Sequence, residues 1–411
     1  MSKYKVIILI LLLIGSLRAQ MIWTQATANA GWSARNRHTS VIFDNKMWVT
    51  GGWDGSNRYN DVWYSSDTGV TWTQATASAG WSARYNHTSV VFDNKLWVMG
   101  GYSSGYKNDV WYSSDGVNWT QATANAGWSV RHAHTSVVFD NKMWVMGGSS
   151  VSPSYRNDVW YSSDTGVTWT QATANAQWAE RSAHTSVVFD NKMWVMGGYS
   201  SGYKNDVWYS TDGVNWTQAT AYAGWVGRVY HTAIVFDNKM WVIGGATASG
   251  FLNNVWYSTN GVTWTQATAS AGWSARYGHT SVVFDNKMWV IGGTTLSGHR
   301  NDVWYSSGLG IEENSQSLIA NRFSLNAEPN PVKSLSVIRY ALPVEQKVRL
   351  SIYDISGKTV KTLVNEYKKP GDYTVKWNGK DEHKRTVAEG VYFYTLETSK
   401  QTFTKKLVLM K

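Results

Sequence analysis

The sequence contains no cysteine among its 411 residues. This absence excludes disulfide bonds, cysteine-bound zinc, covalent haem attachment and catalysis by a thiol. The fold must therefore be stabilised by packing and hydrogen bonding alone. We expect no bound cofactor.

Acidic side chains are scarce over most of the chain. Residues 21–308 contain a single glutamate, Glu180, and nearly all of their aspartates recur at fixed repeat positions. Glycoside hydrolysis needs two carboxyl groups in a local, asymmetric arrangement, and the sequence offers no such pair. We therefore assign no catalytic residue. Glu180 is the best single acid candidate, and a one-off surface substitution is the alternative explanation for it.

Positive charge is not concentrated in the central part of the chain. The first 20 residues contribute +3 to the net charge, residues 21–308 contribute +1 and residues 309–411 contribute +6. The nearly neutral central region lacks the clustered positive field that phosphate backbones require. We expect no nucleic-acid partner.

Long hydrophobic runs are absent after the first 20 residues. Residues 1–20 begin with Lys3 and Lys5, continue as an apolar segment and end in small residues near Ala19. This pattern is typical of a secretory signal peptide. No later stretch approaches the roughly 18 apolar residues of a transmembrane helix. We predict an exported chain without a transmembrane segment.

The dominant feature of the chain is a sixfold repeat. A His-Thr pair recurs at intervals of 47 to 50 residues, beginning at His38, His87, His134, His184, His231 and His279. Each period contains four short strand-like runs, HTSVVFD, MWVMGG, NDVWYSSD and WTQAT, with an Asn-Lys turn after the first run and a strand-breaking Gly-Gly after the second. The period and the four runs predict an all-β fold, a six-bladed β-propeller over residues 21–308.

The last repeat lacks its WTQAT run, and the missing copy lies at the other end of the propeller, in residues 22–32. We predict that this N-terminal strand completes the last blade and closes the ring, which removes two exposed strand edges. Of the 26 tryptophans, 24 occupy four repeat positions. We assign most of them to packing within and between blades.

The motif R-x-x-H-T, the strand ending in Gly-Gly, N-D-V-W-Y and the closing W-T resemble the kelch repeat, a family that includes the central domain of galactose oxidase. The turn SSDTGVTW at residues 65–72 is similar to the Asp-box of sialidase-type propellers. The copper-radical chemistry of galactose oxidase requires a cysteine, which this chain lacks. Sialidase chemistry requires a non-repeating cluster of arginine, tyrosine and acids, which we do not find. Both motifs indicate a fold and say little about an activity.

Residues 309–324 have the composition of a linker, and the alternating runs of residues 325–411 predict a small Ig-like β-sandwich. Its markers, in order, are Pro329-Asn330-Pro331, residues 353–358, Gly390-Val391-Tyr392 and the basic end of the chain. They resemble the C-terminal sorting domains of type IX secretion cargo, which are related to the Ig-like domain of flagellar hook-capping proteins. The resemblance implies that export machinery recognises this domain. It also implies that the protein is secreted, or held at the outer-membrane surface, by a Gram-negative bacterium. A plain Ig-like spacer is the alternative.

Two polar positions are repeated in every blade. Because the first strand of a blade lies nearest the propeller axis, the six histidines could form a metal-binding ring. We favour the alternative that each histidine hydrogen-bonds to a neighbouring blade, and we predict no metal site. The same interpretation applies to the six repeated arginines, although part of that ring could reach an anionic ligand: Arg35, Arg84, Arg131, Arg181, Arg228 and Arg276.

A ligand site is expected where the copies differ. They differ between the repeated Arg and His, and in the loop that follows Gly-Gly. In kelch propellers these two sets of loops lie on one face, around the mouth of the central channel. Aromatic rings mixed with small polar residues and a few bases suit a glycan or an extended peptide. The candidate ligand-binding residues are Arg37, Trp53, Tyr85, Asn86, Tyr102, Tyr106, His132, Tyr155, Glu180, Tyr199, Tyr203, Tyr230, Tyr277 and His299.

Three functions remain open from the sequence. The first is a secreted or cell-surface binding module that recognises a glycan or a protein through the variable loops. The second is a propeller-type carbohydrate-active enzyme, such as a mutarotase, lyase or glycosidase. The third is a purely adhesive or structural surface protein. The near-identity of the repeats favours the binding module.

Overall fold

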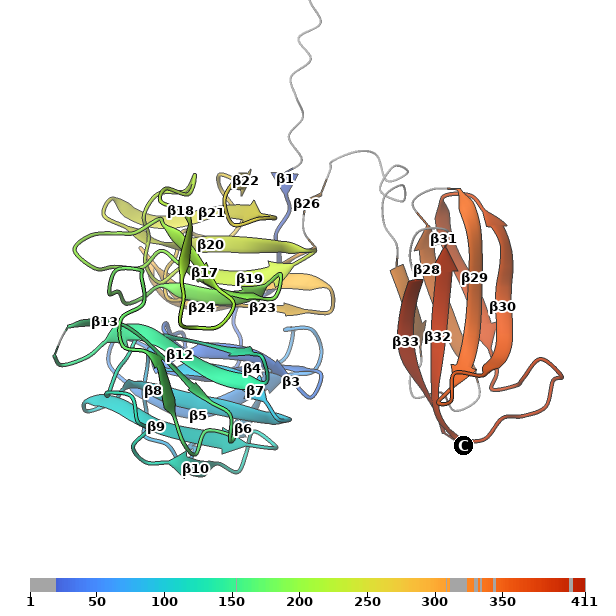
Figure 1. Ribbon diagram of the computed structural model, residues 1–411, viewed down its shortest axis with the longest axis horizontal. Helices are drawn as coiled ribbons and strands as arrows, with labels where there is room; N and C mark the ends of the chain where they lie inside the picture. Colours follow the sequence, from blue (N-terminus) through green and yellow to red (C-terminus); the bar gives the residue numbers. More distant parts are fainter. Residues whose placement is uncertain are drawn as a thin grey trace, which may run out of the picture. The chain divides into compact units, whose positions relative to one another are not determined.

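The computed structural model describes residues 20–152, 154–307, 309–310, 324–328, 332, 335–342, 345–398 and 402–410. The chain divides into two compact units, Met1–Gly310 and Ile311–Lys411 (Figure 1). The predicted signal peptide lies outside the described residues, except for Gln20, as does most of the predicted linker. Within the described ranges, no helix is long and apolar enough to cross a membrane.

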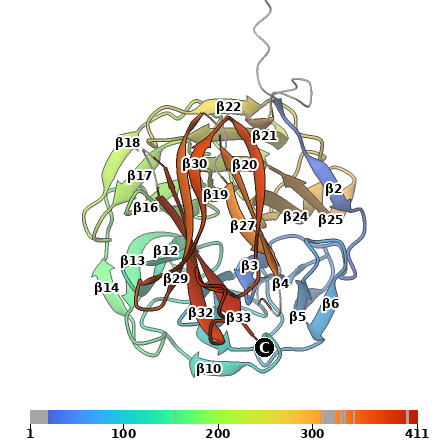
Figure 2. The same cartoon turned by 90° about the vertical axis from the view of Figure 1, so that its right-hand side faces the viewer.

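The first unit is a propeller of six four-stranded antiparallel sheets arranged about a common axis (Figure 2). The predicted six-bladed fold is confirmed. Blade 1 comprises β3 (Thr39–Phe43), β4 (Lys46–Trp53), β5 (Arg58–Ser65) and β6 (Thr73–Thr76). The equivalent strands are β7 (Thr88–Phe92), β8 (Lys95–Tyr102), β9 (Tyr106–Ser113) and β10 (Thr120–Thr123) in blade 2; β11 (Thr135–Phe139), β12 (Lys142–Ser149), β13 (Tyr155–Ser162) and β14 (Thr170–Thr173) in blade 3; β15 (Thr185–Phe189), β16 (Lys192–Met196), β17 (Val207–Ser210) and β18 (Thr217–Thr220) in blade 4; and β19 (Thr232–Phe236), β20 (Lys239–Thr247), β21 (Gly250–Ser258) and β22 (Thr265–Thr268) in blade 5.

The sixth blade is built from both ends of the propeller. It contains β23 (Thr280–Phe284), β24 (Lys287–Thr295) and β25 (Gly298–Ser306), and its outer strand is β2 (Thr24–Thr27). β2 pairs antiparallel with β25, with Thr24 opposite Tyr305. A second short pairing joins β1 (Gln20–Met21) to β26 (Leu309–Gly310), at the start of the predicted linker. The predicted closure by the N-terminal strand is confirmed.

The turn between the first two strands of each blade differs from our prediction. Phe43 pairs with Lys46, so the two turn residues are Asp44 and Asn45 rather than Asn-Lys. Both have positive φ, 47° and 54°. Asp and Asn tolerate the left-handed conformation that a two-residue hairpin turn requires at both positions, whereas the lysine belongs to the following strand.

The predicted strand break at Gly-Gly is also wrong in five of the six blades. In blade 1, β4 continues through Gly51 and Gly52 with a shift of register. A Cβ on Gly51 would lie 2.8 Å from Cε1 of His87 in the next blade, and a Cβ on Gly52 would lie 2.8 Å from Cβ of His38. Glycine is required here because two histidines approach the backbone. β16 of blade 4 is the exception and ends at Met196.

Tryptophan packing between blades confirms the structural assignment of most indoles. Trp48, which is 2% exposed, covers Gly116 of the next blade, where an added Cβ would lie 2.2 Å from the ring. Trp81 packs edge-to-face on Trp119 with ring centroids 5.8 Å apart. Each buried indole contributes roughly 4–6 kcal/mol of gross transfer free energy. The same contacts recur around the ring and give each blade interface its apolar core.

The second unit is a β-sandwich of two antiparallel sheets. One sheet contains β27 (Ser324–Glu328), β28 (Ser336–Leu342) and β31 (Gly371–Trp377). The other contains β30 (Thr359–Lys368), β29 (Gln346–Asp354), β32 (Gly390–Thr398) and β33 (Thr402–Leu409). Its core includes Leu350, Trp377 and Leu396. The predicted C-terminal sandwich is confirmed.

Substitution of Gly116 by alanine tests the packing of Trp48 between blades. We expect a loss of about 2–4 kcal/mol in the free energy of unfolding, because the Cβ clashes with the indole and φ is +76°. Urea denaturation measures this loss. The matched control is Gly105→Ala, since a Cβ at Gly105 meets no atom within 4 Å. Equal stability of the two variants would contradict the packing described here.

Removal of residues 20–27 tests the closure of the ring. The deletion removes β2 together with Trp23, which is 7% exposed, and Met21, which is 3% exposed. Losing one buried tryptophan costs about 4 kcal/mol, so we expect the midpoint of thermal unfolding to fall by about 10 °C or more. Ile22→Ala is the control, because Ile22 is 54% exposed. An unchanged midpoint in the deletion variant would exclude N-terminal closure.

Candidate ligand-binding face

The six repeated histidines form a ring inside the propeller and link adjacent blades. His87 Nε2 lies 3.1 Å from Thr39 Oγ1 of the preceding blade, and His38 closes the series with Thr280 at 3.2 Å. The favoured interpretation, a hydrogen bond to the neighbouring blade, is confirmed for five of the six. His231 is the exception, because neither of its ring nitrogens has a hydrogen-bond partner in the described part of the chain. Among the described residues, no group of three or more His, Asp or Glu side chains has an arrangement that could hold a metal ion.

Burial keeps this ring uncharged. Desolvation, with a further contribution from the neighbouring arginines, lowers the pKa of His38, His87, His184 and His279 to about 3. The pKa values of His134 and His231 also lie well below the ordinary value, for the same main reason. The histidines are therefore neutral at pH 7. They pack between adjacent blades as uncharged side chains rather than as cations.

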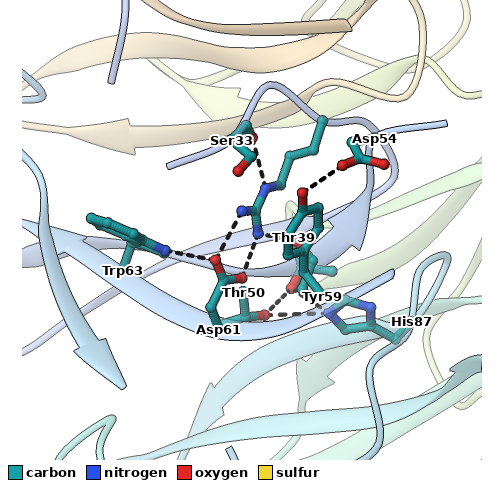
Figure 3. A network of polar contacts seen from close by, with 10 residues as sticks. Ser33, Thr39, Thr50, Asp54, Tyr59, Asp61, Trp63 and His87 are labelled. Carbon is teal, nitrogen blue, oxygen red and sulfur yellow. Dashed lines mark hydrogen bonds and ion pairs between the residues drawn. The ribbon is translucent and has the colours of Figure 1, made fainter. Parts of the chain in front are cut away.

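The repeated arginines are fully buried. In blade 3, Arg131 Nη1 and Nη2 donate to the two carboxylate oxygens of Asp158 at 2.8 and 2.7 Å. Four further blades repeat this bidentate pair, and Figure 3 shows the environment of Asp61 in blade 1, where Trp63 also donates to the carboxylate. In these five blades the guanidinium is already neutralised, so these arginines do not form an anion-binding ring. Blade 5 differs, because the partner of Arg228 is Asn254.

A closed ring of backbone hydrogen bonds surrounds the channel mouth. The residue before each repeated histidine is left-handed, and its N–H donates to the carbonyl of its counterpart in the preceding blade. The six N···O distances run from 2.6 to 3.0 Å. The ring residues are Arg37, Asn86, Ala133, Ala183, Tyr230 and Gly278. This ring and the histidines line an open cavity of about 120 Å³. Side chains of different size therefore project from six equivalent positions, and the mouth is asymmetric.

The two sets of variable loops meet at this mouth. Backbone bridges join Asn36 to Trp53 and Tyr85 to Tyr102, and the other blades repeat the contact. Trp53 stacks on Tyr85 with centroids 5.8 Å apart and an interplanar angle of 29°. The ring centroids of Tyr85 and Tyr102, the next pair in the row, are 5.6 Å apart. Three predicted residues from two blades thus form one continuous aromatic row.

The row continues into blade 3. The rings of Tyr102 and Tyr106 are 5.3 Å apart, and Tyr106 lies edge-on to His132 at 4.8 Å. Burial, with Arg37 as a second cause, lowers the pKa of His132 to about 4. His132 is therefore neutral at pH 7. At the other end of the row, Trp53 contacts His299 at 5.9 Å.

Arg37 stands among tyrosines from three blades. Its guanidinium carbon lies 4.6 Å from the ring centroid of Tyr230, 5.7 Å from that of Tyr85 and 5.8 Å from that of Tyr277. Cation–π contacts of this kind hold the arginine at the mouth. Among the described residues it forms no ion pair, and its buried Nε has no hydrogen-bond partner.

The remaining predicted residues are placed differently. Tyr155, Tyr199 and Tyr203 form a second aromatic group, with Tyr199 lying 6.0 Å from Tyr155 and 5.3 Å from Tyr203. Asn86 is buried in the backbone ring, where its main chain is already hydrogen-bonded. Glu180 is exposed and directly precedes Arg181 in the connection between blades 3 and 4, and no side-chain contact joins it to either aromatic group among the interactions of the described residues.

Three residues that complete the mouth were absent from the predicted set. Arg58 lies over Tyr102 at 5.4 Å, and Phe251 packs on Tyr277 at 4.7 Å. Asp54 accepts hydrogen bonds from the Asn57 and Ser56 backbone and from the Tyr59 hydroxyl. Burial alone would raise the pKa of Asp54, but these bonds hold it well below its usual range. All three lie in the variable loops after Gly-Gly, so comparison of the repeats locates them.

The comparisons with known proteins agree with this architecture. The model of the KLHDC2/KLHL20/DRC7 Kelch-repeats domain matches residues 78–223 and 183–322, which together span more than half of the chain. This chain belongs to the kelch-repeat family. The Kelch motif model also matches residues 34–64 of the kelch propeller, and the FlgD Ig-like domain model matches residues 334–402.

A solved structure gives the kelch propeller a structural counterpart. The protein in "Structure of YjhT" is 16% identical, covers 68% of this chain and 96% of its own length, and superposes with a TM-score of 0.57. At this identity the likeness shows the fold alone. No curated protein matches the chain.

The buried histidines predict an acid-sensitive propeller. Their pKa values are lower in the folded than in the unfolded chain, so stability is complete above pH 6.5 and falls as the pH drops toward 3. Each histidine contributes a loss of about 1.4 kcal/mol per pH unit in this window. Denaturant titration between pH 7 and pH 4 measures the slope. We expect His184→Gln to reduce this slope by the contribution of one histidine, about 1.4 kcal/mol per pH unit.

The control for this experiment is His383→Gln in the second unit, where the side chain is exposed. It should leave the slope of the propeller transition unchanged. A propeller whose stability does not vary between pH 6.5 and pH 4 would contradict the neutral, buried state of the ring.

Proposed function

We propose that this protein is an exported binding protein whose kelch propeller recognises a glycan at the channel mouth. The observation that carries the proposal is the aromatic row from Trp53 through Tyr85 to Tyr102, which lies beside Arg37. Sugar rings present C–H faces that stack on aromatic side chains, and arginine and tyrosine groups can hydrogen-bond the hydroxyls. All four side chains are only partly buried, so a ligand can reach them.

The acid groups near the mouth support binding rather than catalysis. Asp54 already accepts bonds from Ser56, Asn57 and Tyr59, and its low pKa keeps it ionised. A carboxylate in that state does not donate a proton at neutral pH. Glu180, the other acid candidate, lies apart from the aromatic row. A glycosidase would need two convergent carboxyl groups with separated pKa values.

A glycan-array screen of the full chain tests the proposal. We expect binding to selected glycans, and we expect Tyr85→Ala/Tyr102→Ala to weaken it at least tenfold by removing two stacking surfaces. The control is Tyr222→Ala, because Tyr222 is 83% exposed and has no ring contact in the aromatic row. Retention of full binding by the double variant would overturn the site. If the protein binds no glycan but captures a protein through the same tyrosines, the proposed glycan ligand is wrong and the ligand is a protein.

Export through the C-terminal unit is the second part of the proposal. It is supported by the β-sandwich of residues 324–410 and by the match to the FlgD Ig-like domain. Deleting residues 325–411 should leave the propeller inside the cell envelope, because the signal that engages the export machinery is lost. Immunoblotting of culture medium and cell fractions measures this retention. Normal amounts of the truncated protein in the medium would contradict the assignment.

A further inference from the structure

Most charged side chains of the propeller are already paired with a charge of opposite sign. The repeated arginines of five blades pair with aspartates. In all six blades, the lysine that begins the second strand pairs with the aspartate of the turn before it. The net charge of the propeller therefore says little about its surface, which depends on where the unpaired charges lie.

The unpaired charges are separated between the two ends of the strands. The Asp-box turns contain aspartates that bond within their own turns and form no ion pair in the described ranges: Asp67, Asp115, Asp164 and Asp212. The opposite end, which carries the variable loops, contains cations that likewise form no ion pair there: Arg37, Arg58, Lys107, Arg156, Lys204 and Arg300. The unpaired acids at this loop end are Asp54 and Glu180. Positive charge therefore prevails around the channel mouth.

Two of these cations flank the aromatic row. The guanidinium carbons of Arg37 and Arg58 lie 5.7 and 5.9 Å from the ring centroid of Tyr85. Arg58 also lies 5.4 Å from the ring centroid of Tyr102. Burial raises the pKa of the Tyr85 hydroxyl, whereas both arginines oppose this rise. Cation–π contacts position a guanidinium but do not neutralise it. The stacking surface of the row therefore lies in a positive field.

Arg37 keeps its hydrogen-bonding capacity for a ligand. Its side chain is half-buried and lines the open cavity at the mouth. None of its three side-chain nitrogens donates a hydrogen bond to a described residue, and only Nε is buried without a partner. Nη1 and Nη2 are thus the donors that a ligand can use. A planar guanidinium fork of this kind matches two oxygens of a carboxylate or of a sulfate.

Electrostatics distinguishes between neutral and acidic glycans at this site. A neutral sugar can stack on the aromatic row, but it leaves both guanidinium groups without a counter-charge. An acidic group pairs with them in a partly desolvated mouth, where the attraction between charges is stronger than in open water. The positive loop end also accelerates the approach of an anionic ligand.

We propose that the glycan recognised at the mouth is acidic, with sugar rings that stack on Tyr85 and Tyr102 and with carboxylate or sulfate groups that pair with Arg37 and Arg58. This inference rests on the proposed glycan binding and specifies the class of glycan. The remaining cations of the loop end extend the positive surface beyond the mouth, which matches a polymer with several acidic groups: Lys107, Arg156, Lys204 and Arg300.

An array of neutral, uronate-containing and sulfated glycans tests the charge of the ligand on the full chain. We expect the strongest binding to acidic glycans, and the comparison of uronate with sulfate identifies the acidic group. Binding to neutral glycans alone would overturn this inference and leave the proposed glycan binding intact. Absence of glycan binding would overturn both.

Salt dependence gives a test that needs no variant. We expect the affinity for the best acidic glycan to fall at least about fivefold between about 50 mM and about 500 mM sodium chloride, because salt screens partly exposed ion pairs. Methyl esterification of its carboxylates, or removal of its sulfates, should cause a similar loss. An affinity that is insensitive to salt and to neutralisation of the glycan would contradict the proposal.

Charge-matched variants locate the contact. We expect Arg37→Gln and Arg58→Gln each to weaken binding of the acidic glycan roughly tenfold and to leave binding of its neutralised form unchanged. The control is Lys46→Gln, which removes the same charge from the opposite end of the strands, where Lys46 pairs with Asp44. Arg58 is exposed, so its variant keeps the test valid if Arg37→Gln does not fold. Equal losses in Lys46→Gln and Arg58→Gln would overturn the site.

Discussion

The contact between a histidine and a pair of glycines, repeated at every blade interface, is the constraint on which the rest of the propeller depends. At all six interfaces, a Cβ added to the first glycine of one blade would lie only 2.7 to 2.9 Å from the imidazole Cε1 of the next blade. The second glycine admits the histidine of its own blade. Any side chain at these positions would separate the blades. Close approach is what allows the ring of backbone hydrogen bonds to form at the mouth.

The same constraint explains how a nearly symmetric chain obtains an asymmetric channel mouth. Six residues are held in the left-handed conformation by the backbone ring, and their side chains are free to differ. Arg37 and Tyr230 project where other blades have Ala133 or Gly278. The proposed recognition would thus depend on a few substitutions at the mouth, while tryptophan and arginine–aspartate contacts keep the scaffold unchanged. Blade 5 shows that a scaffold position can also diverge, through Asn254.

Most of the fold, but only part of the site, could be predicted from the sequence. Period, strand patterns and the displaced WTQAT run predicted six blades, the closing strand and the C-terminal sandwich. The partner of five of the six repeated arginines is an aspartate 25 to 27 positions later, and this pairing depends on the folded blade. The convergence of Arg37 with Tyr85, Tyr230 and Tyr277 depends on ring closure, which joins distant positions.

Identical sequences also differ in the extent of their strand pairing in this propeller. YSSGYK forms a regular hairpin in blade 2, where Tyr102 pairs with Tyr106. In blade 4 the same six residues belong to no strand, although Tyr199 still pairs with Tyr203 through an isolated bridge, and the carbonyl of Tyr203 lies where a Cβ on Gly227 would be 2.5 Å away. The equivalent of Gly227 beside the blade 2 loop is Val130, which prevents this approach. A residue of the following connection therefore limits how closely each loop approaches, whereas the two tyrosine rings lie 5.3 Å apart in both copies.

The most direct test of a ligand site at the mouth is hydrogen–deuterium exchange of the full chain with and without its best glycan. The structure predicts added protection in the loops that carry Trp53, Tyr85 and Tyr102, and unchanged exchange in the Asp-box turns at the opposite ends of the strands. Protection confined to those turns, or to the C-terminal sandwich, would contradict it.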